Sequence, residues 1–97
     1  MITTGSILRV FLEENGLEIV RHKRYKTDAG HLMDSIGIRP SEDSSPISLH
    51  AFTDGTIIIE HDWSLQSIRT NIHNPDSLDI VLRYVTKWPR PEREWKL

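Results

Sequence analysis

Residues 49–62 read LHAFTDGTIIIEHD, two β-prone runs on either side of the pair Asp54-Gly55. Asp-Gly is a favoured pair for a two-residue type I′ turn, because both central residues take positive φ, which Gly adopts freely and Asp tolerates. The stretch therefore predicts a β-hairpin, and an antiparallel sheet is the centre of the expected fold.

Helices are predicted on both sides of this hairpin along the chain. Apolar residues at helical spacing indicate a helix over Thr4–Glu14, which Asn15-Gly16 would end. A second helix is expected from Asn74 as its cap, because Pro75 suits the first helical turn. The apolar stripe of the second helix consists of Leu78, Val81, Leu82 and Val85.

The remaining segments complete an α+β domain. Strands are predicted over Leu17–Lys26 and His31–Arg39, and a loop over Pro40–Pro46. Trp63–His73 indicates an irregular or short helical link, since its apolar residues have a roughly helical spacing. We therefore expect an N-terminal helix, an antiparallel sheet of three to four strands in a meander with the Asp-Gly hairpin, and a C-terminal helix packed on one sheet face. The domain would span 1–88, and 89–97 would be a Pro-rich charged tail.

Composition limits the classes of function. The chain has 97 residues, no cysteine and a formal net charge of −2. The absence of cysteine excludes disulfides, thiolate zinc sites and a cysteine nucleophile. No apolar run approaches the ~20 residues of a membrane span, and the N-terminus lacks the pattern of a signal peptide. We expect a cytoplasmic protein with no membrane association.

Charge is unevenly distributed along the chain. Residues 31–62 carry one basic and six acidic groups, whereas residues 1–30 and 63–97 are net basic. The acidic middle would suit a basic surface on a protein partner, because opposed fields speed and orient association. The overall balance argues against a protein that global charge holds on nucleic acid.

The hairpin carries two histidines. With a two-residue turn, His50 pairs with Ile59 on the same face as His61, so the two imidazoles would be diagonal neighbours. A shared metal ion is geometrically conceivable, but a catalytic zinc normally needs three protein ligands. The alternative is a pair of partly buried sheet histidines, and we expect no cofactor.

A basic run lies in the first predicted strand. Arg21, Lys23 and Tyr25 would point to one side of the strand, whereas His22, Arg24 and Lys26 would point to the other. Cations beside an aromatic ring suit single-stranded RNA. Lys and Arg also protect edge strands against unwanted pairing. The candidate nucleic-acid-binding residues are Arg21, Lys23, Arg24, Tyr25 and Lys26.

Tryptophan and arginine gather near the C-terminus. These two residue types are enriched at protein interfaces, and no catalytic sequence motif is present to indicate an enzyme. The candidate partner-binding residues are Trp88, Arg90, Arg93, Trp95, Glu60 and Asp62. We expect a small non-enzymatic regulator or inhibitor that binds a protein; the alternative is an RNA-binding or RNA-cleaving domain that uses residues 21–26.

The segment from Ile7 to Lys23, ILRVFLEENGLEIVRHK, resembles the first helix and strand of HicA-type toxins. The resemblance implies a small ribonuclease with a double-stranded-RNA-binding-like α-β-β-β-α layout. The Gly-Ser-His segment that follows the first strand in that family is absent, and residues 23–26 read KRYK at that place. Gly30-His31 is the nearest match, so no catalytic residue is carried over.

Overall fold

The computed structural model describes residues 3–39, 46–61 and 67–87. The predicted tail 89–97 and the predicted loop, apart from Pro46, lie outside these residues. No helix in the described part is long and apolar enough to cross a membrane. The elements are α1 (Thr4–Glu14), β1 (Glu18–Lys26), β2 (Leu32–Arg39), β3 (Ile47–Phe52), β4 (Thr56–His61), β5 (Ser67–Asn71) and α2 (Ser77–Lys87).

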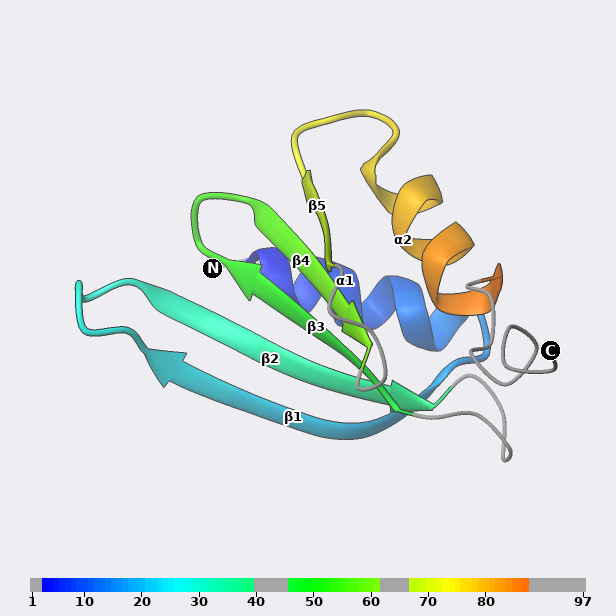
Figure 1. The fold of residues 1–97 in the computed structure, drawn as a ribbon, viewed down its shortest axis with the longest axis horizontal. Coiled ribbons are helices and arrows are strands. Elements are labelled where there is room, and N and C mark those ends of the chain that lie inside the picture. The colour runs from blue at the N-terminus through cyan, green and yellow to red at the C-terminus, as the bar shows by residue number, and fades with distance from the viewer. Residues whose placement is uncertain (1–2, 40–45, 62–66, 88–97) are drawn as a thin grey trace, which may run out of the picture.

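The strands form one antiparallel sheet in the order β1-β2-β3-β4-β5, so each strand pairs with its neighbour in the chain (Figure 1). The predicted α+β class, with a helix before and a helix after an antiparallel sheet, is confirmed. The sheet has five strands instead of the predicted three to four. It also exceeds the three-stranded layout that the resemblance to HicA-type toxins implies.

The additional strand is β5, in a segment for which an irregular or helical link was expected. Ile68 pairs with Ile59, and Thr70 pairs with Ile57. Ile68 and Thr70 therefore lie on the inner side of β5, and Ser67 and Arg69 on the outer side, which is the period of two that a half-buried strand requires. The three-residue step between Leu65 and Ile68 produced the wrong prediction of helical spacing.

The connection between β3 and β4 differs from the predicted type I′ turn. Gly55 has φ 98°, but no described residue other than glycine has positive φ, so Asp54 does not take the conformation that this turn needs. The Gly55 N–H donates to the Phe52 carbonyl at 3.0 Å, and the Asp54 Oδ1 accepts from the Thr56 N–H at 2.9 Å. The loop therefore has three residues, with glycine at the left-handed position.

This longer loop shifts the register of the hairpin by one residue. Leu49 pairs with Ile59, whereas the predicted partner of Ile59 was His50. Because side chains alternate between sheet faces, a shift of one residue moves every side chain of one strand to the other face. His50 and His61 consequently lie on opposite faces of the sheet.

Local capping explains where α1 begins and ends. The Thr3 Oγ1 accepts from the Ser6 N–H at 3.1 Å and caps the N-terminus. At the other end, the Gly16 N–H donates to the Glu13 carbonyl at 3.0 Å, and the Leu17 N–H donates to the Leu12 carbonyl at 3.1 Å. These two bonds form a Schellman motif with Gly16 at φ 76°. The predicted bounds Thr4–Glu14 are confirmed.

The second helix begins later than predicted. Asn74 forms a turn of its own, in which its Oδ1 accepts from the Asp76 N–H at 3.0 Å. The first helical hydrogen bond runs from the Ile80 N–H to the Asp76 carbonyl at 3.0 Å. Asp76 therefore occupies the N-cap position, and α2 starts at Ser77.

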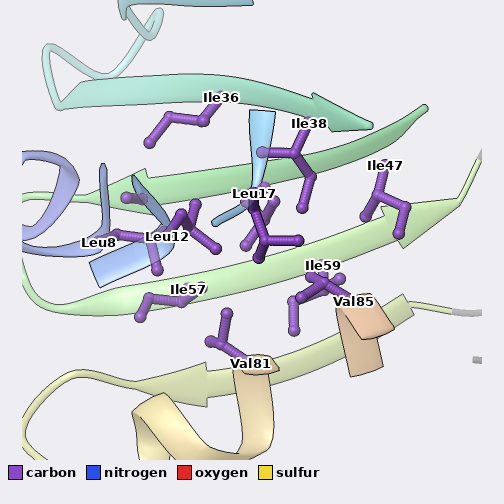
Figure 2. Packing of buried hydrophobic residues seen from close by; sticks show 12 residues of the cluster. Leu8, Leu12, Leu17, Ile36, Ile38, Ile47, Ile57, Ile59, Val81 and Val85 are labelled. Atoms are coloured by element: carbon purple, nitrogen blue, oxygen red, sulfur yellow. The ribbon is translucent and has the colours of Figure 1, made fainter. Parts of the chain in front are cut away.

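Both helices pack on the same face of the sheet. α1 contacts β1, β2 and β3, α2 contacts β5, and the two helices contact each other. Figure 2 shows apolar side chains from both helices among those of the strands. The fully buried members are Leu8, Leu12, Ile36, Ile38, Leu49, Ile57, Ile59 and Val81. The opposite face carries no helix among the described residues.

Candidate functional site

We call the sheet face opposite the helices the open face. The alternation of side chains and the register of the strands place its members in rows that cross the sheet. The members are Glu18, Arg21, Lys23, Tyr25, Met33, Ser35, Gly37, Arg39, Ser48, His50, Phe52, Thr56, Ile58, Glu60, Ser67, Arg69 and Asn71. The face draws on every strand of the sheet.

The basic run of β1 divides between the two faces. Arg21 pairs with Gly37, Lys23 with Ser35 and Tyr25 with Met33, all on the open face. His22 and Arg24 alternate with these residues and lie on the helix face. The residues of the basic run therefore do not form one surface, because they are divided between the two faces of the sheet.

The guanidinium of Arg21 lies along the open face. Its Nη2 donates to the Ser35 Oγ and to the Ser48 Oγ, each at 3.3 Å. A Cβ built on Gly37 would lie 3.4 Å from the Arg21 Cβ and 3.6 Å from both Cζ and Nε. The side chain thus crosses directly over Gly37 and reaches β3.

Four cations (Arg21, Lys23, Arg39 and Arg69) and two carboxylates (Glu18 and Glu60) occupy the open face. Lys23 and Arg69 form no ion pair with a described residue, and both side chains are exposed. The Glu60 Oε1 bonds to the His50 Nε2 at 2.8 Å, which partly satisfies this carboxylate. The open face therefore carries a local positive charge on a chain with a formal net charge of −2.

Aromatic and apolar side chains share the open face with these cations. Tyr25 is 45% exposed, and Phe52 is half-buried. Met33 pairs with both of them across neighbouring strands, so the three side chains form one row. Rings on an uncovered sheet surface offer flat faces on which other planar groups can stack.

A second polar group of residues lies on the helix face, and we call it the Asp34 cluster: Arg9, His22, Arg24 and Asp34. The Arg24 Nε donates to the Asp34 Oδ1 at 2.9 Å, and the Arg24 Nη2 donates to the Oδ2 at 3.4 Å. The His22 Nε2 bonds to the same Oδ1 at 3.2 Å. The Arg9 Nη1 bonds to the His22 Nδ1 at 2.9 Å, which connects α1 to this network.

Asp34 is buried, with a side chain only 6% exposed. Burial by itself would raise the pKa of Asp34. The hydrogen bonds from Arg24 and His22, together with the positive charge of Arg24, outweigh burial and hold the pKa of Asp34 below its ordinary value. The carboxylate is therefore ionised near neutral pH, and it links β1 to β2 beneath α1.

The Asp34 cluster fixes the tautomer of neutral His22. A guanidinium can only donate, so the Nδ1 facing Arg9 accepts a hydrogen bond, and the proton of the neutral ring lies on Nε2, facing Asp34. We expect long-range ¹⁵N–¹H NMR spectra of the folded protein to show a protonated Nε2 and an unprotonated Nδ1 for His22. A neutral ring with its proton on Nδ1 would contradict this arrangement.

Comparisons with known protein families, curated proteins and solved structures find no match.

The sequence-predicted site residues are scattered. Arg21, Lys23 and Tyr25 lie together on the open face, Arg24 belongs to the Asp34 cluster, and Lys26 ends β1 with an exposed side chain. Glu60 lies on the open face. The other candidate partner-binding residues fall outside the described residues: Asp62, Trp88, Arg90, Arg93 and Trp95.

The expectation that the two hairpin histidines are neighbours is wrong. His61 pairs with Ile47 and is buried on the helix face, whereas His50 pairs with Ile58 on the open face. The one-residue register shift is the physical reason. The two rings therefore do not share a metal ion, and no group of three potential ligands occurs among the described residues.

Sequence reasoning missed several members of both sites. Phe52 and Arg69 join the open face only through the register of β3, β4 and β5, for which the sequence has no direct signal. The sequence predictions assign no role to Asp34. The usable signal was its spacing, because a lone carboxylate two residues before Ile36 falls on the buried side of the strand and needs partners there.

Proposed function

We propose that this chain is a small binding module that holds single-stranded RNA on the open face of its sheet. The observation that carries the proposal is that Arg21 and Lys23 lie beside Tyr25 on β1 and share one sheet face with Phe52 and Arg69, a face that no described helix covers. Sheet surfaces of this kind bind unpaired nucleotides, because cations neutralise the phosphates and aromatic rings stack on the bases.

The positions of the three described carboxylates of the segment 31–62 support this proposal over an acidic surface for a protein partner. Within the segment 31–62, Asp34 is buried in its cluster, Asp54 lies in the β3–β4 turn, and Glu60 bonds to His50. These three carboxylates do not form a common acidic surface. The net negative charge of the chain is therefore compatible with a local basic site.

The protein-partner function stays a prediction. Its tryptophan and arginine residues lie outside the described part of the chain, so no geometry of theirs enters the comparison. RNA cleavage has weaker support than RNA binding. His50 is the histidine among the open-face residues; its Nε2 bonds to the Glu60 carboxylate, and its Nδ1 is buried, so neither nitrogen is placed to move a proton on a substrate.

We expect RNA binding to weaken steeply with salt and Lys23→Ala to reduce that dependence. For two phosphate contacts, from Lys23 and Arg69, the affinity should fall about sevenfold between about 50 and about 200 mM salt. Removing one contact should lower the magnitude of the logarithmic slope by about 0.7. The measurement is fluorescence anisotropy with a labelled single-stranded oligoribonucleotide of mixed sequence and about ten nucleotides.

Arg83→Ala is the matched control, because Arg83 is an exposed cation on α2, away from the open face. It should leave both the affinity and the slope close to those of the wild type. Absence of binding at the lower salt concentration would overturn the proposal. So would binding that Arg83→Ala and Lys23→Ala weaken equally, because the open face would then have no special part.

A further inference from the structure

We infer that Arg21 offers the flat face of its guanidinium to an unpaired base of the bound strand, and that it is not a phosphate ligand. The inference rests on the proposed function and deepens it: it assigns a nucleobase, instead of the backbone, to this one cation. The arrangement of Arg21 on the sheet carries the argument.

The first observation is the position of the guanidinium over Gly37. The distances from a Cβ built on Gly37 to the Arg21 Cζ and Nε are both 3.6 Å, which is ordinary van der Waals contact. Glycine at this position lets the guanidinium come down close to the backbone of β2. One face of the planar group therefore rests on the sheet, and its opposite face points away from the sheet on the side that no described helix covers.

The second observation concerns the donors of Arg21. An arginine grips a phosphate through two adjacent N–H groups, either Nη1 with Nη2 or Nε with Nη2. Nη2 belongs to both pairs, and it already donates to the hydroxyls of Ser35 and Ser48. Both bidentate arrangements are thus already occupied by the protein itself. The outward face of the guanidinium stays available, and such planes stack on bases.

The third observation is the order of side chains along β1. Arg21, Lys23 and Tyr25 follow at every second residue, so about 6.6 Å separates each from the next. Lys23, a cation free of ion pairs with described residues, lies between two flat groups. This order places a phosphate ligand between two stacking surfaces, which suits the alternation of bases and phosphates in a single strand.

The test compares Arg21→Lys with the matched replacement Lys23→Arg. Each variant keeps its positive charge, and only Arg21→Lys loses a planar group. We expect Arg21→Lys to weaken binding of the oligoribonucleotide about fivefold or more with an unchanged salt slope. Lys23→Arg should change the affinity less than about twofold, because a phosphate contact needs only the charge.

A second ligand separates bases from backbone. An abasic sugar-phosphate oligomer of the same length presents phosphates alone, so Arg21→Lys should bind it as tightly as the wild type does. Ser48→Ala is a gentler variant that keeps Arg21 but releases one tether of its Nη2. It should weaken binding of the base-bearing strand and leave binding of the abasic oligomer unchanged. Thermal unfolding of each variant checks that its fold is intact.

The outcomes distinguish the inference from the function on which it rests. If the wild type binds no RNA, the proposed function fails. If the wild type binds RNA and Arg21→Lys binds it equally well, the function stands and the stacking role of Arg21 is overturned. An equal loss of affinity for the base-bearing and abasic strands would overturn it too, because Arg21 would then be acting on the backbone.

Discussion

Gly5→Ala should lower the free energy of unfolding by about 3 kcal/mol. Gly5 is buried in the first turn of α1, directly against Asp34. A Cβ added there would lie 2.7 Å from the Asp34 Cβ and 2.5 Å from its Cγ, and closer still to Oδ2. The short Asp34 side chain cannot swing away, because Arg24 and His22 hold its carboxylate. Either α1 must lift from the sheet or the carboxylate must leave its donors.

The size of this effect follows from opposing terms. Overpacking in a well-packed site costs about 1–3 kcal/mol. Displacing a carboxylate from its hydrogen bonds adds about 1.5–3 kcal/mol. Alanine is the better helix former by about 1 kcal/mol, which offsets part of that loss. Urea denaturation of the wild type and the variant measures the difference.

A double-mutant cycle identifies Asp34 as the cause. In an Asp34→Gly background no side chain opposes the new methyl group, so Gly5→Ala should cost nothing or should stabilise the protein slightly. Gly5→Ala without any effect in the wild-type background would mean that α1 does not press on Asp34. An equal loss in both backgrounds would place the strain elsewhere in the helix.

Features that depend on neighbouring residues in the chain were predictable from the sequence. The bounds of α1 follow from Thr3 at its start and from Asn15-Gly16 at its end, and each cap uses only residues within a turn or two. The same reasoning placed the start of α2 too early. Asn74 and Asp76 are both good caps, and only the chain path after β5 decides between them.

Sheet register was not predictable, because two loop lengths fit the same residues. Asp54-Gly55 can form a two-residue turn or the last two positions of a three-residue loop. Burial decides between the two loop lengths, because the observed register brings Leu49 and Ile59 together on the helix face. The sequence Ile57-Ile58-Ile59 does not distinguish the two registers, because in either register β4 places at least one isoleucine in the core.

The candidate sites were likewise predictable only where they depend on residues close together in the chain. The alternation of Arg21, Lys23 and Tyr25 along β1 follows from the period of a strand. Their neighbours on the open face come from strands whose order and register the sequence does not specify, such as Ser48 and Arg69. Gly5 and Asp34 meet only because α1 packs across β2, and no local pattern connects them.

Asp34→Asn should lower the free energy of unfolding by about 2 kcal/mol near neutral pH, and this loss should shrink in acid. Asparagine keeps the size of the side chain but removes its charge. The NH2 group of its amide would then face the N–H of either Arg24 or His22, which bond to the carboxylate in the wild type. Urea denaturation at about pH 7, 5 and 3 gives the difference as a function of pH.

The sign of the pH dependence follows from the lowered pKa of Asp34 in the folded state. The unfolded chain takes up a proton at Asp34 near the ordinary value of about 3.9, whereas the folded protein resists protonation until lower pH. In this range the unfolded state binds more protons, so the stability that Asp34 contributes is present above about pH 5 and is lost as the pH falls. Asp34→Asn removes this part of the acid dependence.

Asp28→Asn is the matched control, because Asp28 is exposed in the β1–β2 turn and shares no hydrogen bond or ion pair with a described residue. It should leave the pH profile unchanged. Some acid dependence should remain in Asp34→Asn, since the Thr56 backbone N–H lowers the pKa of Asp54 as well. If wild type and Asp34→Asn lose stability in parallel between about pH 5 and 3, the Asp34 carboxylate is not ionised against Arg24 and His22 in the folded protein. The cluster would then hold α1 to the sheet by shape alone, and the cost of Gly5→Ala would reduce to its overpacking.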